Sequence, residues 1–317
     1  MKNFVLIGAA GYIAPRHLQA IRDTGNRLAA ALDRSDSVGI LDGYFPDASF
    51  FTEFERFDRH LDKLQRGDAS EHIHFVSICS PNYLHDAHVR FALRAGADAI
   101  CEKPLVLNPW NIDGLEQMEA LTGRKVHTIL QLRLHPAIQA LRSAIQGSVH
   151  STKHEVDLTY ITSRGQWYQH SWKGDERKSG GIATNIGVHF FDMLHFIFGK
   201  VQANRVHLRD AERSAGFLEY ERARVRWFLS VDAGDLPDAQ RASGQRTFRS
   251  ITVDGQEVEF SGGFADLHTE SYRQILAGEG FGLAENRCAI EAVAAIRTAD
   301  LAPLTGDCHP LVSRLHR

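Results

Sequence analysis

One lysine follows directly on a predicted strand, at a place where the backbone fixes a charged side chain. Ile100-Cys101 runs into Glu102-Lys103-Pro104, and the proline keeps the residue before it out of the helical backbone conformation. We therefore expect Lys103 to lie at a corner between a strand and a loop. A lysine held in this way can stabilise an oxyanion that forms on a bound substrate.

A histidine that could act as a base lies in a predicted helix. Segment 181–198 carries apolar residues at helical spacing and ends before a glycine. Asn185, His189 and Asp192 follow one another at i, i+4 and i+7, and at about 100° per residue they form a polar stripe beside the apolar one. Such a stripe can face a cleft, although a buried histidine that is satisfied by a neighbour would have the same pattern.

These residue types suit the oxidation of a secondary alcohol. The reaction removes the hydroxyl proton while a hydride leaves the carbon, so it needs a base with a pKa near neutrality and a cation near the forming oxyanion. His189 suits the base and Lys103 the cation, whereas Asn185 cannot relay a proton and suits substrate orientation. We expect no metal site, because His195 lies about 240° round the helix from His189 and helical ligand pairs are spaced i, i+4.

A glycine-rich turn follows the first predicted strand. Gly8-Ala9-Ala10-Gly11-Tyr12-Ile13-Ala14 departs by one residue from the G-x-G-x-x-G pattern, and glycines in such turns also have purely steric causes. Asp33 ends the second predicted strand 22 residues after Gly11 (33 − 11), close to the spacing of about 20 residues expected of an acid that binds ribose. We predict a dinucleotide site formed by Gly8, Gly11, Tyr12, Ile13 and Asp33.

Asp33 also bears on which dinucleotide is bound. A carboxylate repels the 2′-phosphate of NADP and therefore favours NAD, although the neighbouring Arg34 keeps that choice open. A further loop, Ser80-Pro81-Asn82, follows the strand that should lie beside the first one. We place Ser80, Asn82 and His85 near the cofactor, with an ordinary turn and a helix-capping histidine as the alternative.

The first third of the chain alternates short apolar strands with helical patterns. Strands are predicted at 4–7, 28–32, 75–79 and 99–101, and helices at 15–24, 57–65 and 86–94. Continuously apolar strands between helices predict a parallel sheet that is covered on both faces. The fold class is therefore α/β, with a doubly wound Rossmann domain at residues 1–125.

The remainder, residues 126–317, has a different pattern. Residues 223–231 alternate apolar side chains with arginines, which predicts an α+β domain with a mostly antiparallel open sheet. Asp254-Gly255 predicts a hairpin turn, within a longer loop, between strands at 251–253 and 258–260.

Composition excludes several classes of protein. The 317 residues carry a net charge of -3 with a pI of about 6.6, so no general attraction to nucleic acid or anionic lipid is expected. The four cysteines form no C-x-x-C pair and indicate a reducing compartment. The first residues lead straight into a strand, and no apolar run reaches the length of a membrane span. We predict a cytoplasmic protein.

Several motifs together resemble a known family. They are Pro15-Arg16-His17, Ser80-Pro81-Asn82-x-x-His85, Glu102-Lys103-Pro104, Gln131-x-Arg133-x-x-Pro136 and Asn185-x-Gly187-x-His189-x-x-Asp192. In this order they look like the glucose-fructose oxidoreductase and inositol dehydrogenase family (Gfo/Idh/MocA). The resemblance adds Glu102, Lys103 and Gln131 to the predicted cofactor contacts. It also implies that the open sheet packs against another subunit, in a homotetramer. The family often has aspartate where this chain has Asn185, which puts an aspartate-assisted mechanism in doubt.

A narrower resemblance concerns the substrate. Segments 157–165, 171–175 and 184–189 look like the UDP-N-acetylglucosaminuronate 3-dehydrogenases, which serve the synthesis of diacetamido-uronic acids in bacterial surface polysaccharides. The resemblance implies NAD as cofactor, a UDP-linked uronic acid as substrate and, for some relatives, 2-oxoglutarate as the reoxidant. Because the chain is acidic overall, positively charged side chains near the site must bind such an anion. We predict that Arg164, Lys173, Lys178 and Trp172 bind the substrate. An exposed loop would have the same composition.

Two other functions remain open at this stage. A dehydrogenase of a free sugar or polyol would use the same fold and would not need a uridine site. A dinucleotide-sensing regulator without turnover is the third possibility, and the presence of both Lys103 and His189 argues against it.

Overall fold

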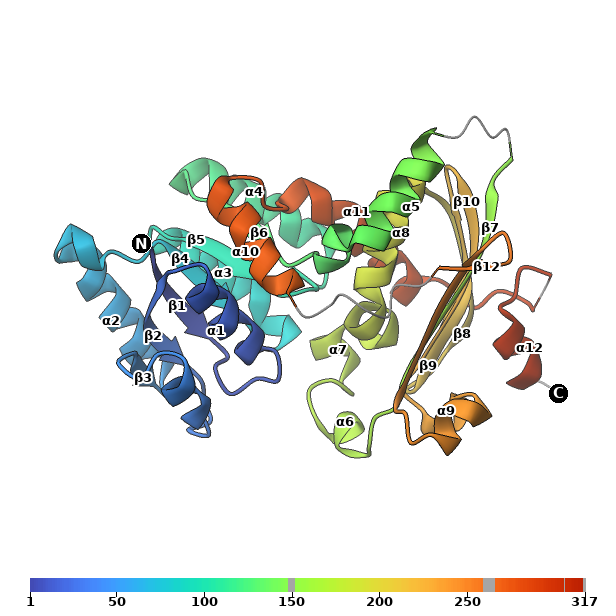
Figure 1. Ribbon diagram of the computed structural model, residues 1–317, viewed down its shortest axis with the longest axis horizontal. Helices are drawn as coiled ribbons and strands as arrows, with labels where there is room; N and C mark the ends of the chain where they lie inside the picture. The colour runs from blue at the N-terminus through green and yellow to red at the C-terminus, as the bar shows by residue number, and fades with distance from the viewer. Residues whose placement is uncertain (148–151, 259–265, 305, 316–317) are drawn as a thin grey trace. The chain divides into compact units, whose positions relative to one another are not determined.

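The chain packs as two units in the computed structural model, which describes residues 1–147, 152–258, 266–304 and 306–315 (Figure 1). The first unit comprises Met1–Gln131 and Ala265–Arg287, and the second comprises Leu132–Phe264 and Cys288–Arg317. The expected division between residues 125 and 126 treats each domain as one continuous stretch. The packing instead returns a later segment to the first unit.

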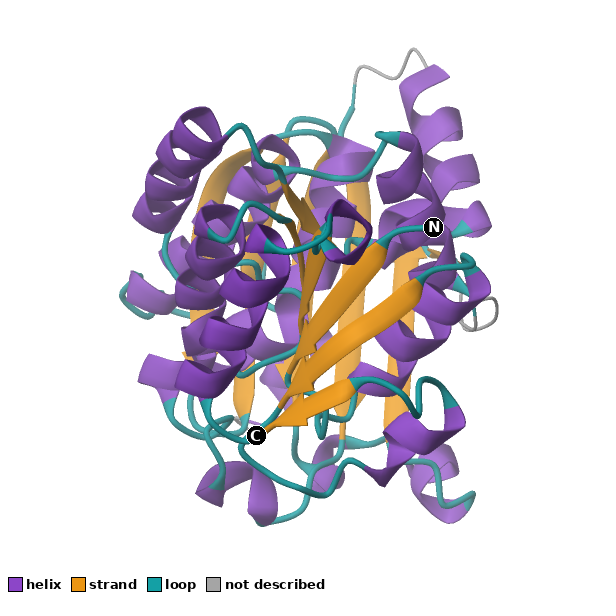
Figure 2. Ribbon diagram, turned by 90° about the vertical axis from the view of Figure 1, so that its left-hand side faces the viewer, coloured by secondary structure: helices purple, strands orange, loops and turns teal. Residues whose placement is uncertain are grey.

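Six parallel strands form the sheet of the first unit. They run in the order β3-β2-β1-β4-β5-β6 and are β1 (Asn3–Ile7), β2 (Arg27–Leu32), β3 (Ser49–Phe51), β4 (Phe75–Ile78), β5 (Asp98–Cys101) and β6 (Val126–Thr128). Every residue of β1 and β4 is buried, as expected of strands covered on both faces, and Figure 2 shows helices on either side of them. The order reverses between β1 and β4, where doubly wound sheets bind their ligands. The predicted Rossmann fold is confirmed.

Helices connect these strands. The long ones are α1 (Ala14–Asp23), α2 (Phe54–Arg66), α3 (His85–Arg94) and α4 (Pro109–Thr122), and short 3₁₀ turns occupy Gly39–Gly43, Ala69–Glu71, Asn82–Leu84 and Gln131–Leu134. Strands β3 and β6 were not predicted. Each has only three residues, too few for an apolar run to stand out, and β6 lies beyond the expected division.

The returning segment supplies α10 (Leu267–Ala277) to the first unit. Tyr272 and Ile275 of this helix are buried in the same core cluster as Leu18 and Ile21 of α1. This apolar contact explains why a segment that is distant in sequence packs with the Rossmann domain.

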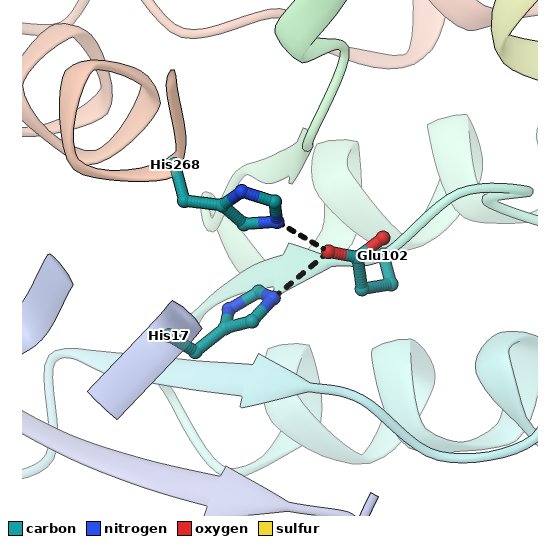
Figure 3. A group of neighbouring side chains, drawn as sticks. All are labelled: His17, Glu102 and His268. Carbon is teal, nitrogen blue, oxygen red and sulfur yellow. Dashed lines mark hydrogen bonds and ion pairs between the residues drawn. The ribbon is translucent and has the colours of Figure 1, made fainter. Parts of the chain in front are cut away.

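A buried polar network also joins α1, the end of β5 and α10 (Figure 3). The Nε2 atoms of His17 and His268 both lie 3.0 Å from Oε1 of Glu102, and Glu102 is only 6% exposed. Burial by itself raises the pKa of Glu102, but hydrogen bonds and charge from the two histidines hold that pKa well below its ordinary value. Glu102 is therefore a carboxylate that accepts an N–H from each ring.

The network continues from His17 to the centre of the sheet. Nδ1 of His17 lies 2.8 Å from the Tyr272 hydroxyl, which in turn lies 2.6 Å from Oγ of Ser77 on β4. Because Nε2 of His17 donates to Glu102, its Nδ1 accepts from Tyr272, and Ser77 donates to the tyrosine oxygen. Burial is the main cause of the raised pKa of Tyr272, so this phenol keeps its proton.

The second unit is built on a six-stranded sheet in the order β12-β11-β7-β10-β9-β8. Its strands are β7 (His154–Thr162), β8 (Val201–Arg209), β9 (Arg213–Tyr220), β10 (Ala223–Ser230), β11 (Thr247–Val253) and β12 (Gln256–Glu257). Strands β7 and β10 are parallel and the other pairs antiparallel, which confirms the predicted mostly antiparallel sheet.

Helices cover both faces of this second sheet to different extents. Helices α5 (Pro136–Gly147) and α8 (Val188–Phe198) lie on one face, and the shorter α12 (Pro310–Leu315) lies on the other (Figure 1). The remaining helices are α6 (Trp167–His170), α7 (Glu176–Ser179), a π-helix at Ala183–Gly187, a 3₁₀ turn at Ala233–Asp235, α9 (Asp238–Ala242) and α11 (Leu283–Thr298). The first residues of α11, up to Arg287, belong to the first unit. No helix among the described residues is both long and apolar enough to cross a lipid bilayer.

The predicted hairpin is present, but its loop is shorter than expected. Val253 pairs with Gln256, so the loop consists of Asp254 and Gly255 alone, both with positive φ, 51° and 78°. Two such residues form the primed turn that matches the twist of paired strands. The return strand begins at Gln256, and the predicted strand residues Glu259 and Phe260 lie outside the described residues.

The turn after β1 requires glycine at its first position. Gly8 has a φ of +94°, and a Cβ there would lie 2.6 Å from the carbonyl carbon of Cys79 and 2.8 Å from the nitrogen of Ser80. The N–H of Gly8 donates to the carbonyl of Leu32 at 2.8 Å. Two neighbouring strands therefore fix the position of this residue.

Replacing Gly8 with alanine should lower the free energy of unfolding by about 3 kcal/mol or more, since backbone strain adds to a clash with main-chain atoms. Gly25 is a matched control because its φ is +71° and an added Cβ meets nothing within 4 Å. Gly25→Ala should cost about 1 kcal/mol. Urea unfolding followed by circular dichroism measures both, and equal losses would contradict the assigned clash.

Replacing Glu102 with glutamine should destabilise the protein by about 2 kcal/mol at pH 7, since hydrogen bonds to a charged acceptor are lost. The folded-state pKa of Glu102 lies below the ordinary 4.5, so its contribution is complete above that pH and is lost as pH falls through the folded-state pKa. The difference in the free energy of unfolding between wild type and variant should therefore be smaller by about 1 kcal/mol at pH 3.5 than at pH 7. Urea unfolding at pH 7 and pH 3.5 measures this difference, with the exposed Glu55→Gln as control. An equal difference in stability at the two pH values would refute the prediction.

Candidate active site

The glycine turn and Asp33 lie together at the ends of β1 and β2. Oδ2 of Asp33 accepts the N–H of Ala10 at 2.9 Å, and Oδ1 accepts the N–H of Ser35 at the same distance. Gly11 donates its N–H to the carbonyl of Gly8 at 3.0 Å. The carboxylate is half-buried and held against the turn from which α1 starts, the position where a ribose-binding acid belongs.

Two other predicted contacts flank this turn. Tyr12 is 99% exposed, so its ring covers no part of the protein core. Ile13 immediately precedes α1 and packs against the core cluster of the first unit. Of the pair, only Tyr12 presents its whole side chain at the surface of the turn.

The second loop is tied to the lysine loop through His85. This ring is 1% exposed, with Nε2 lying 2.8 Å from the carbonyl oxygen of Ser80 and Nδ1 2.7 Å from that of Pro104. Burial is the main cause of its lowered pKa. Oγ of Ser80 contacts Nδ1 of His88 at 2.8 Å, and Asn82 is buried at the start of the next 3₁₀ turn. His85 thus connects two loops, and direct cofactor contact by Ser80, Asn82 or His85 stays a prediction.

Lys103 follows the network of Figure 3 directly. Its N–H donates to Oε2 of Glu102 at 3.2 Å, so the carboxylate that accepts from two histidines also holds the lysine backbone. The Lys103-Pro104 bond is cis. Of the cofactor contacts implied by the resemblance, Glu102 is thus committed to groups of the protein, and Lys103 is half-buried beside it.

Gln131 carries an unsatisfied atom. Its Oε1 is buried without a hydrogen-bond partner among the described residues. A buried acceptor left unpaired costs about 1–3 kcal/mol, so a bound donor would find favourable energy there. The glycine turn, the fixed Asp33 and this acceptor fit a dinucleotide in the first unit.

One group within the described residues has the composition of a metal site. It is again His17, Glu102 and His268, whose ligand atoms lie within 4.8 Å of one another. The 3.0 Å separations are those of hydrogen bonds, and protons account for them. The prediction of no metal stays a prediction.

In the second unit, Asn185 and His189 lie on one continuous helix over residues 181–198. Its turn at Ala183–Gly187 is a π-helix, so the even 100° spacing assumed from the sequence does not hold at Asn185. Such bulges are frequent at functional sites. Gly187 explains the local approach to the sheet, because a Cβ there would lie 2.5 Å from Cδ1 of Leu229.

Neighbouring aromatic rings position the two predicted residues. Nδ2 of Asn185 donates to the Tyr168 hydroxyl at 2.6 Å, and burial is the main cause of the raised pKa of Tyr168. The half-buried ring of His189 lies 6.0 Å from Tyr160 and 4.2 Å from Phe190, centroid to centroid. These rings limit the rotation of the histidine, as a base needs.

Asp192, the third residue of the stripe, is committed elsewhere. It is 1% exposed, and Arg133 donates to both of its oxygens, from Nε at 2.9 Å and Nη2 at 2.6 Å. A buried carboxylate paired in this bidentate way is a structural ion pair. Nδ1 of His195 contacts the carbonyl of Gly199 at 2.9 Å.

The predicted substrate residues occupy the segment before this helix. Arg164 is exposed at the end of β7, Nζ of Lys173 lies 4.0 Å from the ring centre of Trp172, and Lys178 lies 3.5 Å from Asp175 on α7. Arg164 and Tyr168 interact electrostatically. The structure thus groups Arg164, Tyr168 and Asn185, and separately Trp172 with Lys173.

The sequence patterns did not identify several residues that form the contacts described above. His268 and Tyr272 gave no signal of their own, because a tyrosine or histidine in a partly apolar helix has the pattern of a core residue. Arg133 and His17 occur in the motifs of the resemblance but were given no role. Lys103 belongs to the first unit and His189 to the second.

Two family models match the chain. One is described as "Oxidoreductase family, NAD-binding Rossmann fold" and matches residues 2–130, and the other as "Oxidoreductase family, C-terminal alpha/beta domain" and matches residues 145–243. The inositol 2-dehydrogenase of Rhizobium meliloti is 32% identical over 134 residues, which is 42% of this chain and 39% of that protein. The chain therefore spans less than half the length of the first curated relatives that it matches.

Solved structures match almost completely. The WlbA (WbpB) dehydrogenase from Thermus thermophilus, in complex with NAD and alpha-ketoglutarate, is 53% identical with a TM-score of 0.93, over 98% of this chain and 99% of that one. Its complex with NAD and UDP-GlcNAcA gives 52% identity with the same coverage and TM-score. The chain belongs to the Gfo/Idh/MocA family of oxidoreductases, and its first unit is the NAD-binding Rossmann domain of that family.

Proposed function

We propose that the protein oxidises the C3 hydroxyl of UDP-N-acetylglucosaminuronic acid to the 3-keto sugar, with NAD as the oxidant. The observation that carries the proposal is the 52% identity, over 98% of the chain, to a dehydrogenase that was crystallised with NAD and UDP-GlcNAcA. The narrower resemblance supplies the C3 position and the role in surface polysaccharide synthesis.

His189 is proposed as the base. Its half-buried ring is packed against Tyr160 and Phe190, which leaves it few orientations from which to take the hydroxyl proton. Asn185, anchored to Tyr168, would orient the sugar through its amide. Asp192 takes no part in proton transfer, because Arg133 occupies both of its oxygens.

Lys103 is proposed to stabilise the oxyanion. The N–H bond to Glu102 fixes its backbone, so the ammonium group starts from a defined point and loses little freedom when substrate binds. NAD, when bound, accepts the hydride from the sugar carbon. The glycine turn from Gly8 to Gly11 would receive its pyrophosphate, Asp33 would bind its ribose, and Gln131 would offer it an acceptor.

The second half of the cycle is also a proposal. Alpha-ketoglutarate, which is 2-oxoglutarate, occupies the related crystal structure, and we propose it as the reoxidant. The net exchange converts the sugar alcohol and the keto acid into the keto sugar and 2-hydroxyglutarate, with no free cofactor consumed. A homotetramer in the cytoplasm stays a prediction from the resemblance.

Lys103→Met should lower turnover about 100-fold or more, because the oxyanion loses its cation, and His189→Asn should do so about 100- to 10,000-fold. The assay is NADH formation and keto-sugar detection by mass spectrometry with UDP-GlcNAcA, with and without 2-oxoglutarate. NADH should still bind to both variants.

Lys125→Met and His170→Asn are matched controls, since both residues are exposed and neither has a proposed role. Wild type that binds NADH but makes no keto sugar from UDP-GlcNAcA, while oxidising a free sugar or inositol, would overturn the substrate. Wild-type rates in either active-site variant would overturn the proposed pair.

Asp33→Ala should raise the Kd of NADH about tenfold or more, because the carboxylate is lost from the ribose end, and should leave the Kd of NADPH unchanged or lower. Fluorescence titration with both dinucleotides measures the two Kd values and their ratio. Exposed Asp36 provides the control Asp36→Ala. An unchanged NADH-to-NADPH ratio in the Asp33 variant would show that another residue selects the cofactor.

A further inference from the structure

The second unit contains a pocket of about 340 Å³. Of the predicted catalytic and substrate residues, only Lys173 lines it. Three parts of the chain form its wall: the segment from Lys173 to Ala183, the end of β8 with the turn into β9, and the end of α11. Each part contributes polar or charged groups. The volume exceeds that of a single small ion and falls in the range of ligand sites.

A buried hydroxyl in this wall has no hydrogen bond. Ser214 on β9 is 1% exposed, and its Oγ has no partner among the described residues. A hydroxyl in this state costs about 1–3 kcal/mol relative to a satisfied one. Because the residue lines the pocket, a ligand acceptor there would remove the penalty.

Cations surround the same space. Arg209, Arg297 and Lys173 line the pocket together with the acids Glu176 and Asp210, which gives a formal charge of +1 (3 − 2). Nη1 of Arg209 is fixed by donating to the carbonyls of Ile296 at 2.9 Å and Ala299 at 2.8 Å. Burial lowers the pKa of Arg297, and the charge of Glu176 offsets this only in part. A second anion would stabilise the half-buried guanidinium.

The helix that carries Asn185 and His189 starts at the pocket. Gly181, Ile182 and Ala183 lie in its wall and form the first turn of the helix over 181–198. The N–H of Gly181 donates to Oγ of Ser179 at 3.1 Å. The N–H groups in the first turn of a helix carry partial positive charge, which favours phosphate. Gly181 has a φ of +77°, and a Cβ there would lie 3.5 Å from Cγ and Oε1 of Glu176, so this acid borders the start of the helix.

We propose that this pocket is a phosphoryl-binding site. Two guanidinium groups, a hydroxyl donor and a helix start match the several oxygens of a phosphate better than the two of a carboxylate. Within the proposed function, on which this source rests, the ligand is the diphosphate of the nucleotide sugar. Asn185 lies only two residues beyond Ala183, which joins the pocket to the segment proposed to orient the sugar. A free phosphate is the other source of the same chemistry.

Titration calorimetry with inorganic pyrophosphate tests the site without turnover. Wild type should bind pyrophosphate, Arg297→Met should raise its Kd about tenfold or more, and Ser214→Ala about threefold, as expected for a charged and a neutral hydrogen bond. Arg241→Met, which removes an exposed guanidinium of α9 in the same unit, should bind as wild type does. Thermal midpoints verify that each variant is folded.

Kinetics distinguish the two sources. If the KM for UDP-GlcNAcA rises in Arg297→Met and Ser214→Ala while NADH affinity is kept, the site holds the substrate diphosphate. If pyrophosphate binding is lost but KM is unchanged, the site takes a free phosphate. Absence of wild-type binding, or equal binding by wild type and both variants, overturns the proposal. Because binding is read without turnover, a wild type that fails to oxidise UDP-GlcNAcA refutes the proposed function and leaves this test intact.

Discussion

The carboxylate of Glu102, buried between two histidines, is the interaction on which the first unit depends. A buried charge is costly unless it is hydrogen-bonded, and here His17, His268 and the N–H of Lys103 all donate to it. One anion thereby joins α1, the end of β5 and a helix that returns from far along the chain. The backbone of Lys103, the residue proposed to stabilise the oxyanion, is held in position by this arrangement.

The two units solve the problem of fixing a functional side chain in different ways. The first relies on backbone geometry: a glycine packed against two neighbouring strands, an aspartate that accepts the Ala10 N–H of the turn, and a histidine that connects two loops. The second packs its histidine among rings and interrupts the regular helix at the π-turn before it. Both devices limit motion in the free enzyme, which lowers the entropy lost when substrate binds.

Some charged side chains of the second unit neutralise each other in ion pairs, whereas those that line the pocket leave a net positive charge. Arg133 and Asp192 neutralise each other in the core, and Arg226 and Asp157 form a second bidentate pair on the sheet. The pocket between α7, β9 and α11 instead has more cations than anions and an unsatisfied hydroxyl. In an acidic protein this local excess of positive charge supports the proposed phosphoryl-binding site.

The sequence by itself determined the features that depend on local spacing. Alternating apolar strands and helices specified the Rossmann domain, the proline after Lys103 marked a corner, and the interval from Gly11 to Asp33 located the acid at the turn. Only the tertiary structure decided which polar groups meet. Nothing near His268 in the chain indicates Glu102, 166 residues away, and nothing at Ser214 indicates Arg297. The contacts within a helix or turn are set by a fixed periodicity, whereas contacts between distant segments are set by how whole elements pack, and no local pattern encodes that.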